Sequence, residues 1–410
     1  MLPLADARRI VRGLAPPLQA ETLRLTEAVG RVLVDDVQAP IALPPWTHSA
    51  MDGYAVRSDD VVPGGQLQLN EVVPAGVAPR HVVTPGTATA VMTGTMMPDG
   101  ADGVLVIEET DGAMDGVVTL SSSAEAGPHI RAAGEEVSVG ELVGTRGQVI
   151  RPGDVSLWAA LGLAEVRVAR RPRVAVLITG DELVSPGQPL EPGQIYGSNQ
   201  HTLSAWLPLS GAICVEARRV GDSRRALQEA LEALEPTADL VVTTGGASMG
   251  VRDLLQEVVV DGGGVVHLWK VAMKPGKPVL VGGLAGGTPW IGLPGNPVSC
   301  AVGYLQFVHT WVRRSLGATG DEIETLSAYT SDMLPARRDR AHLLRVQISA
   351  GDGRLTCKRS GRQGSASLPA LRLADGLVTV PAGESITAGT LVEVQLFPGP
   401  LPGTWSGRGP

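Results

Sequence analysis

The chain has 410 residues, of which 43% are hydrophobic and 19% charged, and its net charge is −8 at pH 7. This length predicts two to four domains, and the acidic balance without a long basic run excludes nonspecific nucleic-acid binding, which needs a concentrated cationic face. Three widely separated cysteines exclude a disulfide framework and a structural zinc site, and no apolar run reaches the roughly eighteen residues of a membrane span, so we expect a cytoplasmic protein.

The first 170 residues predict mainly short elements. A helix is expected near the start of segment 1–48, which ends in a proline-punctuated connector. Short β-like runs broken by glycine and proline predict a small β-rich module over 49–140. A helix is expected over 155–161, with Asp154 as its N-cap.

From residue 171 the pattern alternates between strands and helices. Strands are predicted over 173–179, 239–244, 265–269, 279–281 and 290–293, and helices over 199–209, 223–234 and 298–313. This alternation predicts a mostly parallel sheet with helices on both faces, and ligands of such sheets bind where the strands end. Residues 325–402 return to short strands and turns, which predicts a terminal β-barrel or sandwich.

The lysines of this chain are few and clustered. Only four of the 34 basic residues are lysine, and three of them, Lys270, Lys274 and Lys277, fall within eight positions. A compact ammonium differs from a planar guanidinium in hydration and hydrogen-bond geometry. The cluster therefore predicts a place where point charges converge on an anion; the alternative is a basic turn.

Carboxylates and a glycine-rich turn follow the predicted strands of the α/β segment. Glu182 comes after the first strand, and a turn with Gly245, Gly246 and Ser248 follows a later strand. Glycine lets backbone N–H groups approach a phosphate, and a carboxylate at a strand end is well placed for Mg²⁺. These features together predict a site for a phosphorylated ligand and a metal, although a plain strand-to-helix turn also explains the glycines.

Three aspartates and one asparagine each have a structural alternative. Asp222 precedes the predicted helix 223–234, where helix capping explains an aspartate without any ligand, and Asp253 sits just inside the helix expected after the glycine turn, where dipole compensation does so. Asn296 precedes a proline and fits a helix cap in a rigid turn. Asp52 lies in the polar run 47–55, and its Asp-Gly pair is alternatively only a turn.

The chain resembles the molybdopterin molybdenumtransferase family, the MoeA and gephyrin E-domain type, through six motifs in the family's order. They are Ser-Ala-Met-Asp-Gly-Tyr-Ala (49–55), Met-Thr-Gly-Thr (92–95), Thr-Gly-Asp-Glu-Leu (179–183), Gly-Gly-Ala-Ser-Met-Gly (245–250), Lys-Pro-Gly-Lys-Pro (274–278) and Gly-Leu-Pro-Gly-Asn-Pro (292–297). Gln-Gly-Ser (363–365) follows closer to the C-terminus. The resemblance covers essentially the whole chain.

The resemblance implies a multidomain fold of α/β and β units. The expected units are a linking domain from 1–48 and 141–170, a β-rich insertion domain over 49–140, a three-layer α/β molybdopterin-binding domain over 171–320 and a C-terminal β-barrel over 325–402. It also implies a homodimer in which the insertion domain of one subunit faces the α/β domain of the other. The active site would then be shared between the two subunits.

The same resemblance implies that adenylylated molybdopterin and molybdate are the substrates, and that phosphoanhydride cleavage yields AMP and molybdenum cofactor with Mg²⁺ as the metal. Further candidate partners are the upstream adenylyltransferase and molybdoenzyme apoproteins. The implied catalytic residues are Asp52, Glu182, Asp222, Asp253, Lys270 and Lys274, with Glu182, Asp222 and Asp253 as metal ligands. The implied substrate-binding residues are Thr93, Glu136, Ser198, Asn199, Gly245, Gly246, Ser248, Lys277, Pro278, Pro294, Asn296, Arg345 and Ser365.

The chain departs from the family pattern at three places. Glu136 stands where the family typically has Asp, and Gly197 stands where an Asp usually precedes the Ser-Asn pair. Residues 69–76 match the pattern of the insertion domain only loosely. Two alternatives stay open on the sequence. One is a scaffold of this fold that binds a protein partner without turnover, and the other is a molybdopterin adenylyltransferase, which needs only the α/β unit.

Overall fold

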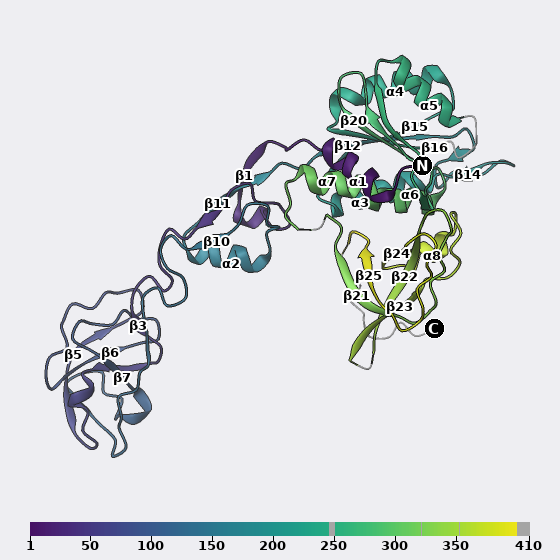
Figure 1. The fold of residues 1–410 in the computed structure, drawn as a ribbon. Helices are drawn as coiled ribbons and strands as arrows, with labels where there is room; N and C mark the ends of the chain where they lie inside the picture. Colours follow the sequence, from purple (N-terminus) through teal and green to yellow (C-terminus); the bar gives the residue numbers. More distant parts are fainter. Residues whose placement is uncertain (246–250, 321, 352, 400–410) are drawn as a thin grey trace.

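The protein is elongated in the computed structural model, which describes residues 1–245, 251–320, 322–351 and 353–399 (Figure 1). A β-rich module forms one end of the molecule. A sheet covered by helices and a second β unit form the other end, and a narrow connecting region lies between the two ends. Residues of the β-rich module are therefore far from the helix-covered sheet within one chain. None of the helices in the described part is both long and apolar enough to cross a membrane.

The connecting region is built from two antiparallel strand pairs and two helices, of which one is a short 3-10 helix. The pairs are β1 (Ala20–Arg24) with β11 (Glu165–Ala169) and β2 (Val37–Gln38) with β10 (Leu142–Gly144), and the helices are η1 (Leu25–Glu27) and α2 (Pro152–Ala160). Arg151 is the N-cap of α2, and its N–H donates to the carboxylate of Asp154 at 2.7 Å. The prediction of a helix start at residue 155 with Asp154 as N-cap is therefore wrong. Pro152 is tolerated in the first turn, where its missing N–H has no intrahelical partner to lose.

The β-rich module contains a five-stranded sheet in the order β7-β4-β6-β5-β8. Its strands are β4 (Gly53–Val56), β5 (Gln66–Val73), β6 (Thr87–Val91), β7 (Gly103–Val106) and β8 (Val117–Thr119), accompanied by the pair β3 (His48–Ser49) and β9 (Ile130–Arg131) and by η2 (Ser58–Asp60) and η3 (Ile107–Glu109). Tyr54, Leu67 and Leu105 are buried in its own hydrophobic core. The predicted β-rich module is confirmed.

The helix-covered unit has a six-stranded sheet in the order β15-β12-β16-β20-β19-β17. Its strands are β12 (Arg173–Thr179), β15 (Ile213–Val220), β16 (Leu240–Gly245), β17 (Val265–Trp269), β19 (Leu280–Gly283) and β20 (Pro289–Leu293), and the small parallel pair β13 (Leu183–Val184) and β14 (Ile195–Tyr196) lies beside it. The first four strands in this order are parallel, and β19 runs antiparallel to both of its neighbours, β20 and β17. The predicted mostly parallel sheet is confirmed.

Helices cover both faces of this sheet. They are α1 (Leu4–Gly13), α3 (Ser198–Leu209), α4 (Arg224–Leu234), η4 (Glu235–Thr237), α5 (Val251–Asp261), α6 (Pro297–Gly303), the π-helical segment η5 (Tyr304–His309) and α7 (Thr310–Ser315). Along β12, Val174, Val176 and Ile178 join the core with α1, α3 and α6, whereas Ala175 and Leu177 join the core with α4 and α5. This alternation follows from the two-residue period of a strand. The α/β unit therefore has the three layers that were expected (Figure 1).

Helix α4 corrects one prediction that bears on the site. The helix begins at Arg224, and the hydroxyl of the N-cap residue Ser223 accepts the N–H of Ala226 at 3.3 Å. Asp222 is therefore not the cap that its sequence position suggested. Its carboxylate accepts a hydrogen bond from the hydroxyl of Thr179 instead. Because Ser223 caps the helix, the Asp222 side chain does not bond to it and lies beside Thr179 at the end of the sheet.

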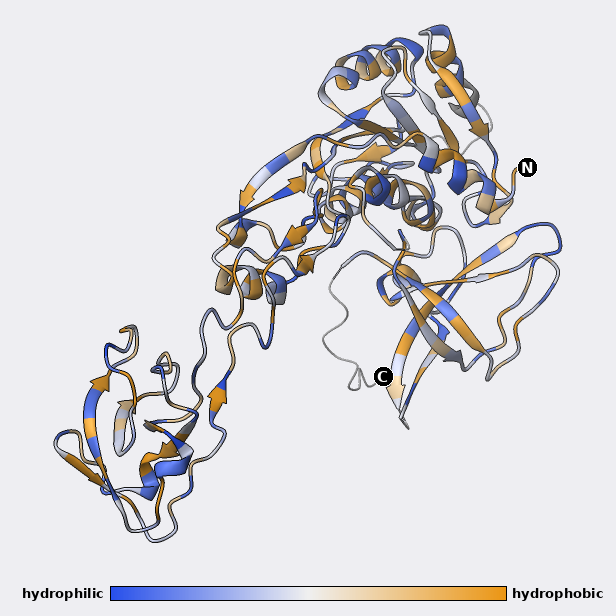
Figure 2. Cartoon of the chain, turned by 60° about the vertical axis from the view of Figure 1, so that its left-hand side comes forward, coloured by the Kyte–Doolittle hydropathy of each residue, from blue (hydrophilic) through white to orange (hydrophobic). Residues whose placement is uncertain are grey.

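The last unit is a closed five-stranded barrel in which β22 pairs with β23, then β21, β25 and β24 follow, and β24 returns to β22. The strands are β21 (Thr325–Thr330), β22 (Ala341–Gly351), β23 (Arg354–Arg359), β24 (Gly376–Val380) and β25 (Leu391–Leu396), with the short helix α8 (Leu368–Arg372). Apolar and polar residues alternate along several of its strands (Figure 2). One more strand, β18 (Met273–Lys274), comes from the preceding unit and pairs with β22, so that Lys274 lies opposite His342. The lysine segment is therefore attached to the barrel.

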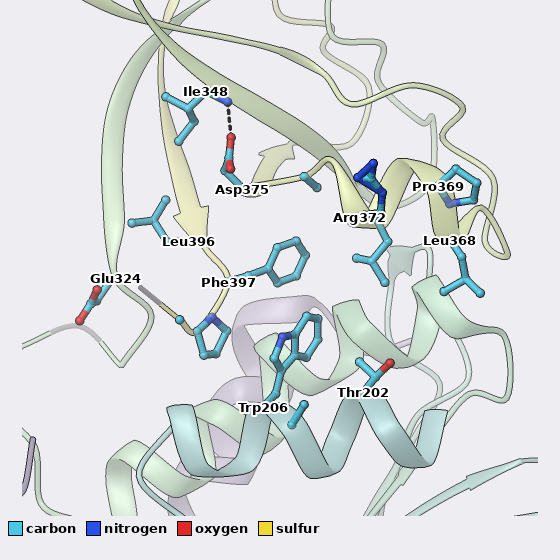
Figure 3. A pocket seen from close by; sticks show the side chains of 15 residues that line it. Thr202, Trp206, Glu324, Ile348, Leu368, Pro369, Arg372, Asp375, Leu396 and Phe397 are labelled. Carbon is cyan, nitrogen blue, oxygen red and sulfur yellow. Dashed lines mark hydrogen bonds between the residues drawn. The ribbon is translucent and has the colours of Figure 1, made fainter. Parts of the chain in front are cut away.

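A cavity of about 720 Å³ lies between α3 and the barrel (Figure 3). Trp206 of α3 stacks on Phe397, with ring centroids 5.1 Å apart. The carboxylate of Asp375, on the barrel side, accepts the N–H of Ile348 at 2.7 Å. None of the predicted site residues lines this cavity. It is a largely apolar seam between the two units, and the predicted site lies elsewhere.

Candidate functional site

The parallel strands bring several predicted residues to one edge of the α/β sheet. Thr179, at the end of β12, lies opposite Val220 of β15 and Gly245 of β16. On the other side of β16, β20 ends at Leu293. Asp222, Glu182 and Pro294 follow three of these strands, and Gly245 ends the fourth. The carboxyl edge of the sheet therefore gathers residues that are more than a hundred positions apart in the chain.

Carboxylates occupy the β15 and β12 side of this edge. The backbone N–H of Asp222 donates to the carboxylate of Asp181 at 3.1 Å. The carboxylate of Glu182 folds back toward Gly180, where a β-carbon would lie only 2.7 Å from Glu182 Oε2. Any side chain at Gly180 would therefore displace Glu182. Because Mg²⁺ takes one or two carboxylates together with phosphate oxygens, these donors fit that ion.

Part of the predicted site falls outside the described residues. Gly246 and Ser248 are in the undescribed segment 246–250, and the side chain of Asp253, at the start of α5, is also undescribed. Within the described ranges, no three His, Cys, Asp or Glu side chains are grouped closely enough to hold a metal ion. The metal role of the predicted aspartate and glutamate set therefore stays a prediction.

Gly245 cannot be replaced without a clash at the centre of the edge. Its φ is +149°, and a β-carbon there would lie 2.2 Å from the carbonyl oxygen of Thr179 on the neighbouring strand. Such close approach of two backbones requires glycine. The glycine that begins the predicted phosphate turn thus has a structural reason that is independent of any ligand.

Asn199 connects the ends of β16 and β20. Its side-chain amide donates to the hydroxyl of Thr244 at 3.0 Å and to the carbonyl of Gly295 at 2.7 Å. The Thr244 hydroxyl in turn donates to the carbonyl of Pro294 at 3.1 Å. Asn199 is buried, and Ser198 beside it begins α3 and is half-buried. The structure therefore gives Asn199 a role in fixing the turn that follows β20.

That turn forms one wall of a polar cavity of about 610 Å³ between the α/β unit and the barrel. Six predicted residues line the cavity: Lys274, Lys277, Pro278, Pro294, Asn296 and Ser365. The α/β unit supplies the first five, and a barrel turn supplies Ser365. The structure thus brings together the lysine, Gly-Leu-Pro-Gly-Asn-Pro and Gln-Gly-Ser motifs in one place.

Three charged residues of the cavity were not predicted from the sequence. Arg337, Asp339 and Arg340 line it from the barrel segment before β22. The side chains of Asp339 and Arg340 form an ion pair. Three arginines within four positions, 337–340, were the available signal, but only the pairing of β18 with β22 brings their segment next to the lysines.

The cavity is electropositive before any ligand enters. Its lining holds two lysines and two arginines against one aspartate. Burial, followed by the charges of Arg337 and Arg340, lowers the pKa of Lys274 below its ordinary value. A bound anion would offset this repulsion, because an opposite charge nearby favours the ammonium form. The cavity therefore has the charge expected of an oxyanion site.

Arg345 supports this cavity from behind and does not line it. Its side chain is fully buried and donates to the carbonyls of Arg362 at 2.6 Å and Gly364 at 3.2 Å. Its Nε and Nη1 have no hydrogen-bond partner among the described residues, and burial lowers its pKa to about 10. The carbonyl of Ser365 accepts the N–H of Val298 at 3.0 Å. Arg345 thus holds the turn that presents Ser365.

Lys270 lies apart from the other two clustered lysines. It does not line the polar cavity. Its backbone has a φ of 69°, and its ammonium lies 3.5 Å from the ring centroid of Trp269, as in a cation–π contact. Within one chain, the structure does not bring Lys270 to the predicted anion site.

Asp52, Thr93 and Glu136 belong to the distant part of the molecule. One carboxylate oxygen of Asp52 accepts the Thr93 N–H at 2.7 Å and the Thr93 hydroxyl at 2.9 Å. These two bonds, the backbone one foremost, lower the pKa of Asp52. Glu136 is exposed, and its N–H donates to the carbonyl of Leu43 at 3.0 Å. The elongated shape separates all three residues from the sheet edge of the same chain (Figure 1).

Family models match almost the whole length of the chain. Residues 2–162 match the MoeA N-terminal region, domains I and II. Residues 175–314 match a probable molybdopterin-binding domain, and residues 327–397 match the MoeA C-terminal region, domain IV.

Individual proteins of known name are similar over the same length. Molybdopterin molybdenumtransferase 2 of Mycobacterium tuberculosis is 37% identical over 405 residues, which cover 96% of this chain and 99% of that protein. Molybdopterin molybdenumtransferase of Haemophilus influenzae is 38% identical over 77% of this chain and 78% of its own length. Two crystal structures of MoeA proteins from Pyrococcus horikoshii superpose with TM-scores of 0.83 and 0.79, at 30% and 27% identity, and each covers 97% of this chain and 100% of its own.

Proposed function

The chain belongs to the MoeA family of molybdopterin molybdenumtransferases, and from that premise we propose that it inserts molybdate into adenylylated molybdopterin and releases AMP. The chain is thereby a transferase of molybdenum cofactor biosynthesis. The observation that carries the proposal is the polar cavity in which Lys274, Lys277 and Ser365 meet beside the carboxyl edge of the sheet. Under this proposal, the oxyanion and the phosphates would be bound next to one another on one surface.

Molybdate is assigned to the polar cavity. Molybdate is a small tetrahedral dianion, and ammonium donors can surround it without the planar constraint of a guanidinium. Lys274 and Lys277 supply such donors, and the hydroxyl of Ser365 can donate one more hydrogen bond. Arg345 contributes indirectly, because it holds the carbonyls of Arg362 and Gly364 and thereby orients the Ser365 turn.

The adenylylated pterin is assigned to the sheet edge next to the cavity. In open α/β sheets, ligands bind outside the carboxyl ends of the strands. The hydrogen bonds from Asn199 to Thr244 and Gly295 connect this edge with the cavity wall, so that the two substrates would lie against one continuous structure. Such positioning favours reaction between two bound groups.

Mg²⁺ would be held by Glu182 and Asp222, with Asp253 as a third ligand by its place in the family motif. When bound, this ion supplies charge neutralisation for the oxygens of the phosphoanhydride. The proposal is supported by the carboxylate oxygens at the sheet edge, whose donor chemistry suits a hard cation. Asp222 is held in place by the hydroxyl of Thr179.

A homodimer completes the proposed site. Asp52 and Thr93 carry family motifs, but they lie at the far end of the same chain from Glu182 (Figure 1). A second copy can bring its β-rich module to the sheet edge, and Asp52 would then enter as an ionised carboxylate held by Thr93. We further propose a cytoplasmic location, in line with the composition.

Release of AMP tests the function directly. Purified protein is mixed with adenylylated molybdopterin, Mg²⁺ and molybdate, and AMP is quantified by chromatography. We expect AMP to accumulate with molybdate and to fall to background in Lys274→Ala, whose control is Lys358→Ala on the exposed surface of β23. Absence of AMP from the wild-type reaction, with the pterin shown to be bound, would refute the proposed function.

A further inference from the structure

We propose that Arg337 is an additional oxyanion-binding residue, which the barrel contributes to the polar cavity opposite Lys274. The inference rests on the proposed function and extends it. An anion in the cavity would then be bound from two sides, by lysines of the α/β unit and by an arginine of the barrel. The barrel then takes part in substrate binding directly and not only as a support for the Ser365 turn.

The backbone around Arg337 is held firmly. Leu334 and Ile386 exchange two backbone hydrogen bonds, of 2.8 and 3.0 Å, and the carbonyl of Arg337 accepts the N–H of Gly383 at 2.7 Å. Between them, the N–H of Ala336 donates to the hydroxyl of Ser385 at 2.9 Å. These bonds fix the backbone at Arg337, and the exposed side chain extends from that fixed point.

A buried histidine anchors the same segment to the strand that faces Lys274. His342 lies opposite Lys274 in the β18–β22 pairing, and its Nδ1 is 2.7 Å from the carbonyl of Pro335. Because a carbonyl only accepts, Nδ1 carries the proton. Burial, together with the charges of Arg337, Lys274 and Arg345, lowers the pKa of His342. His342 is therefore neutral at physiological pH and acts as a positioning residue.

Arg337 differs from its neighbours in having its charge available. Arg340 pairs with Asp339, whose carboxylate neutralises it. In the part of the chain that the structure describes, Arg337 forms no ion pair and no side-chain hydrogen bond. An unpaired guanidinium that shares a cavity with two ammonium groups is available to an anion, whose charge would offset their mutual repulsion. The arrangement therefore suits a dianion that touches both walls.

The test compares two arginines that are adjacent in the chain. Arg338 is exposed on the same segment but does not line the cavity, so Arg338→Gln is the matched control for Arg337→Gln. Binding of sodium molybdate to the full-length protein is measured by isothermal titration calorimetry at constant ionic strength. We expect Arg337→Gln to weaken binding about tenfold, equivalent to about 1.4 kcal/mol, and Arg338→Gln to change it by less than about twofold. Arg337→Lys should recover most of the affinity, because it keeps the charge.

The pH dependence separates a direct contact from a general disturbance of the segment. Wild-type binding should decline as pH rises through the lowered pKa of Lys274. The charged and titratable groups around that ammonium are Arg337, Asp339 and Arg340 from the barrel segment, His342 from β22 and Lys277 from its own loop, whereas Arg345 lies behind the cavity wall. Removing the Arg337 charge raises the pKa of Lys274, so the decline should move to higher pH in Arg337→Gln.

The outcomes are distinguishable. Equal affinities and equal pH profiles for Arg337→Gln and Arg338→Gln, with the wild type binding molybdate, would overturn this inference and leave the proposed function standing. A wild-type protein that binds no molybdate would overturn both. Weaker binding in Arg337→Gln with an unshifted pH profile would also reject the opposed placement of Arg337 and Lys274. Circular dichroism confirms that each variant is folded.

Discussion

Backbone strain introduced at one residue, in the loop between Lys274 and Lys277, tests whether that loop positions the two lysines for the anion. Gly276 lies between Lys274 and Lys277 and has a φ of +97°. Alanine in this region of backbone space costs about 1–3 kcal/mol. A β-carbon would also lie 2.7 Å from the terminal methyl of Met273, a flexible group that can move aside. Gly276→Ala is therefore expected to strain the loop without unfolding the protein.

The loop can relieve that strain only by rotating toward ordinary φ values, which moves both lysines. If restoring their geometry costs 1–3 kcal/mol, molybdate binding weakens by about 5- to 150-fold, since each 1.4 kcal/mol is a factor of about ten. The expected readout is a higher molybdate KM in the AMP-release assay. The thermal midpoint should fall slightly, because the same strain is felt in the folded state.

Gly287 supplies the matched control. It lies in the turn between β19 and β20, its φ is +89°, and a β-carbon there would meet nothing within 4 Å. Gly287→Ala should therefore lower thermal stability to a similar extent without altering the molybdate KM. If the two variants show the same molybdate dependence, the loop does not position the lysines for the anion, and this reasoning is refuted.

Three further predictions concern charge and assembly. Lys274→Arg should lower the rate of AMP release at least tenfold, because a planar guanidinium does not replace a compact ammonium at the anion. The control Lys358→Arg, on the exposed strand β23, should not alter the rate. Near-wild-type activity of Lys274→Arg would disprove the need for an ammonium at this position. Thr93→Val removes one of the two hydrogen-bond donors to Asp52, so the pKa of Asp52 should rise toward its ordinary value. In a carboxyl NMR titration, the carboxylate should then become protonated at a higher pH than in the wild type. An unchanged titration midpoint would contradict the hydrogen-bond assignment. Asp52→Asn and Glu182→Gln should each be inactive alone but regain partial activity when the two proteins are mixed and reassembled. In the heterodimer, one of the two shared sites then has both Asp52 and Glu182 intact. A mixture that stays inactive despite heterodimer formation would reject the shared site.

The sequence was sufficient for the architecture and for six of the fifteen residues that line the polar cavity. Strand β12 is buried on both faces, so the uninterrupted apolar run at 174–178 already identified it. The lysine cluster stood out because arginine is used elsewhere in the chain. Two of its three members, Lys274 and Lys277, line the cavity. These features are local, and local pattern was enough to find them.

Features that depend on segments close in space but distant in the sequence could not be predicted from local sequence patterns. Asp222 looked like a helix cap because aspartate is common there, but Ser223 performs that role and Asp222 meets Thr179 from a strand 43 positions away. Arg337 reaches the lysines only because β18 joins the barrel beside β22. Lys270 shares the cluster in sequence, yet its backbone conformation directs it to Trp269.

The central claim is that the chain couples loss of AMP to insertion of molybdenum. The most direct measurement is the amount of molybdenum bound to pterin, by mass spectrometry, against the AMP released in the same reaction. We predict equal molar amounts, both dependent on molybdate and both abolished in Lys274→Ala. AMP release without molybdenum in the pterin would contradict the account, because the polar cavity would then have no part in the reaction.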